Sequence, residues 1–223
     1  MKKVTISMLF CIFSIFAYAQ VDIGGTANYS QVEDDGTLVF KGTATVWDDI
    51  QIPGLAAKAK DKAPVMDIFL GETQLYHFSQ AITNSEEQVY FTIQFPHSWA
   101  GTTIYPHVHY TPETNPAADE SARWGLEYTW VEYNDVTPIV FPSTETVYVD
   151  AEVSSSSAKK HLIASFGPII PSSDQNNISS MMVCRLFRNS GHANDTYTGR
   201  VALLQFDIHY EKNTVGSRTD FTK

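Results

Sequence analysis

Cysteine is scarce in this sequence, so the fold that it encodes cannot rely on disulfide bonds. Only Cys11 and Cys184 are present. Cys11 lies in an apolar N-terminal stretch that we expect to be removed, which leaves Cys184 alone. A single cysteine cannot form an intramolecular disulfide. The fold must therefore be held by a hydrophobic core, and a mature chain of about 200 residues is long enough to bury one in a single domain.

Basic residues are also few. The sequence has 15 Lys and Arg against 25 Asp and Glu, which gives a formal net charge of −10. Removal of Lys2 and Lys3 with an N-terminal signal leaves 13 against 25, or −12. A surface of this charge repels nucleic-acid phosphates and anionic membranes. We therefore expect no nucleic acid among the partners of this protein.

Long hydrophobic runs are absent except near the N-terminus. Residues 4–16 are mostly apolar, follow Lys2 and Lys3, and precede Ala17-Tyr18-Ala19, the small-x-small pattern at which signal peptidase cleaves. A run of about 13 residues is too short for a permanent membrane span, which needs about 20. We predict a signal peptide at residues 1–19, a secreted or periplasmic mature protein, and no membrane insertion.

Helical signals are weak, whereas strand signals recur along the chain. Val89, Phe91 and Ile93 alternate with more polar neighbours, which is the period-two pattern of a half-buried strand. Similar runs are separated by turns rich in Gly, Pro, Asn and Ser. We predict about eight strands, near residues 38–47, 89–95, 103–111, 124–130, 145–153, 161–166, 180–188 and 202–210. Residues 55–62 could form two helical turns between two prolines.

About eight strands without intervening helices predict an all-β fold, and our first choice is a jelly-roll-like two-sheet β-sandwich in one domain. The organisation that we expect is a signal peptide (1–19), an exposed N-terminal arm (20–36), the β-sandwich domain (37–211) and a polar C-terminal tail (212–223). A short polar tail is either disordered or laid along a neighbouring subunit.

The sharpest local pattern is a histidine pair. His107 and His109 lie two residues apart in a predicted strand, so both imidazoles point to the same face, as half of a metal site would. With Gly101 and Glu113, the spacing is similar to the first metal-binding signature of the cupin family, which implies His107, His109 and Glu113 as ligands. Glu120 stands where that signature has a glycine, and the second cupin signature is not recognisable.

Two alternatives to a cupin-type site stay open. In a homotrimer with this strand near the threefold axis, the histidine pairs of three chains would surround one transition metal. Otherwise, His107 and His109 are hydrogen-bonded polar side chains on a strand face. No catalytic constellation is recognisable elsewhere, because Ser190-Gly191-His192 lacks a nucleophile elbow and Cys184 lies in an apolar run typical of a buried thiol.

Several ordered blocks resemble a family of bacteriophage and prophage virion-associated proteins of the head-fibre, decoration or tail-associated type. The resemblance covers the chain from about Thr45 onward. Its blocks are 45–49 (TVWDD), 89–99 (VYFTIQFPHSW), 101–110 (GTTIYPHVHY), 124–130 (WGLEYTW), 178–188 (ISSMMVCRLFR), 206–210 (FDIHY) and 214–219 (TVGSRT).

This resemblance implies a non-enzymatic β-sandwich subunit that forms homo-oligomers, often trimers, and acts in assembly or in binding a surface glycan or another protein. The alternative is a metal-dependent cupin-like enzyme that uses His107, His109 and Glu113. Phage structural proteins assemble in the host cytoplasm and need no secretory signal. The signal at residues 1–19 therefore indicates either a domain that has been recruited for an exported role, which is the hypothesis that we favour, or a family that extends beyond virions.

We expect the exported protein to begin at Gln20. Ala19→Arg should block cleavage, because signal peptidase needs a small residue at that position. Intact-mass spectrometry of periplasmic and cytoplasmic fractions checks both statements. Recovery of the wild-type chain only from the cytoplasm, with residues 1–19 attached, would contradict them.

Overall fold

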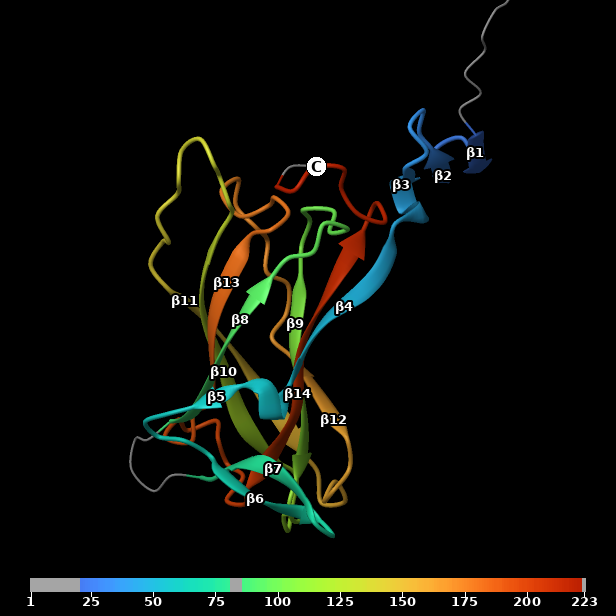
Figure 1. Cartoon of the computed structure of the whole chain (residues 1–223). Coiled ribbons are helices and arrows are strands. Elements are labelled where there is room, and N and C mark those ends of the chain that lie inside the picture. The colour runs from blue at the N-terminus through green and yellow to red at the C-terminus, as the bar shows by residue number, and fades with distance from the viewer. Residues whose placement is uncertain (1–20, 81–85, 222–223) are drawn as a thin grey trace, which may run out of the picture.

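The computed structural model describes residues 21–80 and 86–221, and its regular structure is almost entirely β (Figure 1). The predicted signal peptide lies outside these residues. No helix in the described ranges is long and apolar enough to cross a membrane. The strands are β1 (Val21–Gly24), β2 (Tyr29–Val32), β3 (Leu38–Lys41), β4 (Val46–Pro53), β5 (Lys58–Ala59), β6 (Val65–Leu70), β7 (Thr73–Phe78), β8 (Glu87–Gln94), β9 (Tyr105–Pro112), β10 (Glu120–Val131), β11 (Glu145–Val153), β12 (Leu162–Ser165), β13 (Met181–Arg188) and β14 (Val201–Lys212).

The strands from β7 to β14 form a jelly roll. The five-stranded sheet has the order β11-β10-β13-β8-β5, and the six-stranded sheet has the order β12-β9-β14-β7-β6, with β4 also paired to β14. From β7 onward, consecutive strands alternate between the two sheets at every step except the β10–β11 pair, which are neighbours in one sheet. This alternation is the jelly-roll arrangement, so the predicted fold class is confirmed.

The structure has 14 strands in the described residues, against about eight predicted, and β1, β2, β5 and β6 are among those that were not predicted. The predicted strand 38–47 is divided into β3, the 3₁₀ turn η1 (Gly42–Ala44) and the start of β4. The first strand of the jelly roll, β7, was not predicted. The helical turns predicted at 55–62 are wrong, because a 3₁₀ turn, η2 (Gly54–Ala56), leads there into β5, which pairs with β8.

The core lies between the two sheets and is rich in aromatic rings. Phe95 stacks on Trp130 with 4.6 Å between ring centroids and packs against Trp99 at 4.5 Å. The indole nitrogen of Trp130 donates a 3.0 Å hydrogen bond to Ser180, which satisfies the polar atom of a buried ring. The remaining cysteine, Cys184, also faces this core, and burial raises the pKa of its thiol. The predicted burial of this thiol is confirmed, and a thiol with a raised pKa carries little of the reactive thiolate at neutral pH.

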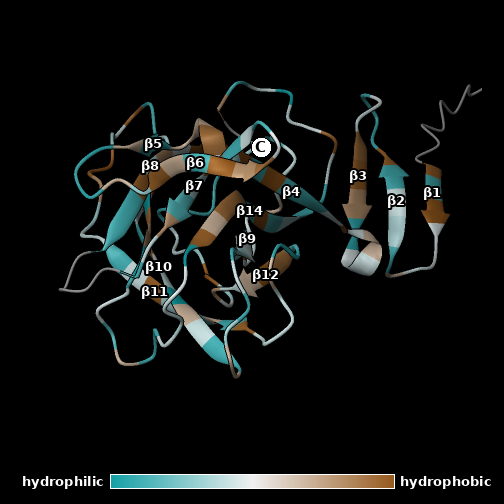
Figure 2. Ribbon diagram, turned by 90° about the horizontal axis from the view of Figure 1, so that it is seen from below, coloured by the Kyte–Doolittle hydropathy of each residue, from teal (hydrophilic) through white to brown (hydrophobic). Residues whose placement is uncertain are grey.

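The N-terminal strands β1, β2 and β3 form a separate three-stranded sheet, so β3 belongs with the arm and not with the β-sandwich that was expected to begin at residue 37. From here on, the arm means residues 21–41. The arm projects away from the jelly roll, and the end-on view shows it standing apart from the body (Figures 1 and 2). Strand pairing aligns five apolar side chains on one face of the arm. They are Val21, Ile23, Val32, Leu38 and Phe40, and none belongs to the core of the body.

The C-terminal segment after β14 lies against the arm of its own chain. The backbone nitrogen of Phe40 donates to the carbonyl of Asn213 at 2.7 Å. Arg218 reaches across to Glu33, with 2.9 Å between nitrogen and oxygen. The described part of the predicted polar tail therefore joins the arm to the end of the jelly roll.

A buried ion pair ties one end of the sandwich together. Arg188, the last residue of β13, pairs with Asp195 at 2.7 Å, and both side chains are fully buried. The same guanidinium donates to the carbonyl oxygens of Phe78 at 3.1 Å and Gly199 at 2.7 Å, and to that of Tyr197. These bonds connect both sheets to the loop before β14.

Asp195→Ala should lower the free energy of unfolding by about 3–5 kcal/mol, because it leaves the Arg188 charge buried without its partner. Chemical denaturation followed by tryptophan fluorescence measures this loss. The matched control is Arg218→Ala, which breaks a half-exposed ion pair and should cost only about 0–1 kcal/mol. Equal losses in the two variants would contradict the importance assigned to the buried pair.

Candidate functional site

Four neighbouring strands align polar side chains on the outer face of the six-stranded sheet. His107 in β9 is the register partner of Asp207 in β14, which in turn faces Gln51 in β4. On the other side of β9, Ser165 in β12 is the register partner of His107. Because residues two apart share a face of a strand, His109 and His209 also lie on this outer face.

The opposite faces of the same strands point into the core. Val108 in β9 and Phe206 and Ile208 in β14 are buried in the hydrophobic cluster between the sheets. Each of these residues is adjacent in sequence to a histidine or to Asp207. The alternation that builds the core therefore also presents the polar groups on the outside.

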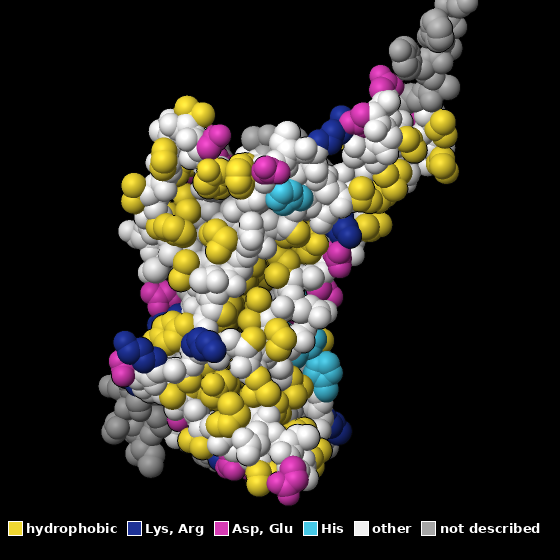
Figure 3. Space-filling model, viewed as in Figure 1, with side chains coloured by type: hydrophobic (Ala, Val, Ile, Leu, Met, Phe, Trp, Pro, Cys, Tyr) yellow, Lys and Arg dark blue, Asp and Glu magenta, His cyan; other side chains and the backbone are white. Residues whose placement is uncertain are grey.

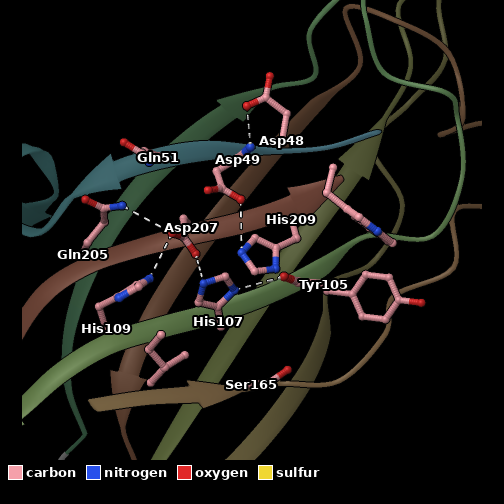
Figure 4. Close-up of a pocket in the computed structure, with 12 residues that line it drawn as sticks. Asp48, Asp49, Gln51, Tyr105, His107, His109, Ser165, Gln205, Asp207 and His209 are labelled. Atoms are coloured by element: carbon pink, nitrogen blue, oxygen red, sulfur yellow. Dashed lines mark hydrogen bonds and ion pairs between the residues drawn. The ribbon is translucent and has the colours of Figure 1, made fainter. Parts of the chain in front are cut away.

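These side chains line a pocket of about 870 Å³, shown in Figure 4. Aromatic and aliphatic groups border the polar ones, and Trp47 meets Tyr105 edge-on with 5.5 Å between ring centroids. The lining residues are Trp47, Asp48, Asp49, Gln51, Tyr105, His107, His109, Ile163, Ser165, Gln205, Asp207 and His209.

The carboxylate of Asp207 is the centre of the pocket, and its side chain is only 4% exposed. Its Oδ1 atom lies against Nε2 of His107. Its Oδ2 atom lies 3.0 Å from Nε2 of His109 and 3.3 Å from the amide nitrogen of Gln205. One buried carboxylate therefore contacts two imidazoles (Figure 4).

The second nitrogen of each imidazole is also held. Nδ1 of His107 lies 3.3 Å from the carbonyl oxygen of Tyr105, and Nδ1 of His109 lies 2.6 Å from Nε2 of His161. His209 lies beside His107 with 4.3 Å between ring centroids. Its Nε2 atom is 3.1 Å from a carboxylate oxygen of Asp49.

Burial and charge shift the pKa values of these groups in different directions. Burial alone would lower the pKa of His107, but the hydrogen bond and the charge of Asp207 raise it above its usual value. For His109, burial prevails over Asp207 and lowers the pKa. Burial tends to raise the pKa of Asp207, yet His107 and His109 together hold it below its usual value. The carboxylate is therefore ionised at neutral pH.

The structure brings together two of the three ligands predicted from the cupin-like spacing. His107 and His109 share one face of β9, as the alternation predicted. Glu113 instead forms a two-point ion pair with Arg200, at 2.6 and 2.7 Å, and is not among the pocket residues. Burial would raise the pKa of Glu113, but the hydrogen bond to Arg200 is the larger effect and lowers it.

Asp207 and His209 take the place expected for Glu113 beside the histidine pair. One donor atom each from His107, Asp207 and His209 lie within 4.8 Å of one another. The alternation in residues 202–210 already placed Asp207 and His209 on a polar face. The alternation does not show which strand lies beside β14. The sequence alone therefore could not place Asp207 and His209 next to His107.

No protein-family model and no curated protein matches this chain. The resemblance to phage structural proteins therefore stays a prediction. The function has to be argued from the surfaces that the structure presents, namely this pocket and the arm.

In metal-free protein, we expect His107 to titrate above pH 6.5 and His109 below it. Asp207→Asn should lower the pKa of His107 relative to the wild type, because the burial remains and the neighbouring charge is gone. Imidazole signals in NMR titrations measure both values. An unchanged pKa of His107 in the variant would contradict the role of Asp207 in raising it.

The same shift predicts how stability depends on pH. Because the pKa of His107 is raised in the folded state, its stabilising effect is present below pH 6.5 and disappears as the pH rises through the folded-state value. In Asp207→Asn this contribution should become smaller, because the main group that raises the pKa is gone. Urea denaturation at several pH values between 5 and 8 tests the weaker pH dependence.

Proposed function

We propose that this chain is an exported, non-enzymatic β-sandwich subunit that forms homo-oligomers through its arm. The resemblance to phage structural proteins and the signal peptide predicted at residues 1–19 favour such a role. The observation that carries the proposal is the apolar face of the arm. A subunit of this kind acts through its surfaces, with a glycan or another protein as the candidate ligand.

The apolar face of the arm has no second layer within the described residues. Val21, Ile23 and Val32 are 51%, 67% and 38% exposed, and Leu38 and Phe40 are half-buried. Figure 3 shows hydrophobic side chains along the arm, away from the body. A small antiparallel sheet is stable when its apolar face packs against another element. The arm therefore needs a partner surface.

A second copy of the chain is the occupant that the charge distribution favours. The sequence carries a net charge of −10, so two copies repel each other over most of their surface. The five side chains on the apolar face include no charged group. This face is therefore a place where two acidic chains can meet without like-charge repulsion.

Strand β6 offers a second apolar surface, at one edge of the six-stranded sheet. Its exposed side chains are Val65, Met66, Ile68 and Leu70, all between 42% and 52% exposed. Exposed apolar edge strands are sites where chains associate. Two different apolar surfaces on one chain permit a head-to-tail contact that closes into a ring, as in a trimer.

The cupin-like alternative has less support. Its third ligand, Glu113, is held by Arg200, which also pairs with Asp67 at 2.8 Å. The histidine pair lies on the outer face of the sheet, away from the core between the sheets. The proposed function therefore does not depend on a cupin active site.

We expect residues 20–223 to form an oligomer at micromolar concentration, and Ile23→Asp to dissociate it by placing a charge in the apolar contact. Multi-angle light scattering measures the mass directly. The matched control is Asp22→Ser, which lies on the opposite face of the same strand and should leave the mass unchanged. A monomeric wild type, or an oligomer that survives Ile23→Asp, would overturn the proposal.

A further inference from the structure

We propose that His107, Asp207 and His209 form a binding site for one divalent transition-metal ion, such as Zn²⁺ or Fe²⁺, in each chain. The proposal is independent of the oligomer held by the arm, because all three side chains come from the same jelly roll. It differs from the ligand set predicted from the sequence, since Asp207 and His209 replace Glu113, and His109 becomes a positioning residue.

The donor atoms are close enough to converge on one ion. They lie within 4.8 Å of one another, whereas neighbouring ligands around a tetrahedral ion with bonds of about 2.0–2.1 Å are roughly 3.4 Å apart. His107 and Asp207 are buried and face each other across two paired strands. The His209 side chain is 49% exposed, so its ring has room to rotate and bring its donor atom closer to those of His107 and Asp207.

The hydrogen bonds of His107 leave one nitrogen directed at the carboxylate. Nδ1 faces the carbonyl oxygen of Tyr105, which can only accept, so Nδ1 carries a proton. A neutral ring then presents a lone pair at Nε2, against Oδ1 of Asp207. Two lone pairs in contact repel, so either the ring carries a second proton or the two atoms move apart to about 3.4 Å around a metal ion. The pair is therefore arranged to share a positive charge.

The two oxygens of Asp207 have different partners. Oδ1 is buried and lies against Nε2 of His107, a group that can give up its proton. Oδ2 is held by His109 and Gln205. The carboxylate is thus fixed through Oδ2, while a metal ion can take the place of the proton shared by Oδ1 and His107.

Further carboxylate and imidazole groups surround the three donors as they do in known metal sites. Asp49 holds one nitrogen of His209, which leaves the other ring nitrogen for an ion. His161 holds His109, and His109 in turn holds Asp207. Such outer hydrogen bonds orient metal ligands and strengthen binding.

The donor set selects the class of metal. Two imidazoles and one carboxylate suit Zn²⁺, Fe²⁺ and their neighbours in the first transition row, whereas Mg²⁺ and Ca²⁺ prefer oxygen ligands. Three protein ligands leave coordination positions open toward the pocket. A bound ion would therefore be accessible to a small ligand in the space bordered by Trp47 and Ile163.

The experiment uses residues 20–223 without an affinity tag, freed of metal with EDTA and then dialysed against Zn²⁺. Elemental analysis should find one zinc per chain, and calorimetric titration should give the same stoichiometry. His107→Ala, Asp207→Asn and His209→Ala should each weaken binding at least about 100-fold. His109→Ala should weaken it about 10- to 100-fold with the stoichiometry retained, because that residue only positions Asp207.

The matched control is His192→Ala, an exposed histidine outside the pocket, which should bind zinc like the wild type. Thermal melting of each metal-free variant confirms that it is folded, and zinc should raise the melting temperature only where the site is intact. Ile23→Asp should retain its zinc even as a monomer, which separates this proposal from that of the oligomer.

Three results would overturn the proposal. They are wild-type protein that binds no zinc, folded Asp207→Asn that binds it with wild-type affinity, and one zinc per three chains. The first result would leave His107 and Asp207 as a protonated ion pair. The last would instead indicate a site shared on a threefold axis.

Discussion

The pairing of β14 with its neighbours is the constraint on which both the core and the pocket depend. This strand contacts β9 on one side, and β7 and then β4 on the other. Its alternation sends Phe206 and Ile208 into the core and Asp207 and His209 to the outer face. A slip of one residue would bury the ionised carboxylate between the sheets and expose the phenylalanine. The burial of apolar side chains that fixes the register of β14 thus also places Asp207 and His209 on the outer face. The polar site needs no separate stabilisation to hold this arrangement.

The buried ion pair of Arg188 and Asp195 differs from the buried carboxylate of Asp207 in its surroundings. Arg188 and Asp195 are fully buried, and the guanidinium is satisfied by two carboxylate oxygens and several carbonyl groups, so this network is complete within the chain. Asp207 is nearly as buried, but it borders a pocket, and its Oδ1 atom lies against a titratable group, Nε2 of His107. A network of buried charges that is complete within the chain is what structure alone requires. A buried carboxylate beside titratable imidazoles and open to a pocket is typical of a site that binds something.

Much of the fold follows from local patterns, because alternation is a property of single strands. Val89, Phe91 and Ile93 identify β8 without reference to the rest of the chain, and β9 to β14 follow in the same way. Strand β7 and the division at Gly42–Ala44 were missed, since short strands and 3₁₀ turns carry weak periodic signals. His107 and His109 could be predicted to share a face because that follows from the alternation within β9 alone. Asp207, His209 and Asp49 could not, because strand pairing between residues about 100 and 160 positions apart brings them together.

Strand β4 links the arm and the pocket. It leaves the base of the arm at Val46 and runs beside β14, where Asp49 holds His209 and Gln51 faces Asp207 (Figure 1). Trp47, at the start of this strand, is 57% exposed and contacts Tyr105 in the pocket. A partner that packs on the arm therefore lies close to the strand that holds one of the proposed ligands. The three ligands themselves come from β9 and β14, which pair with each other within the jelly roll, so the site does not need the partner in order to form.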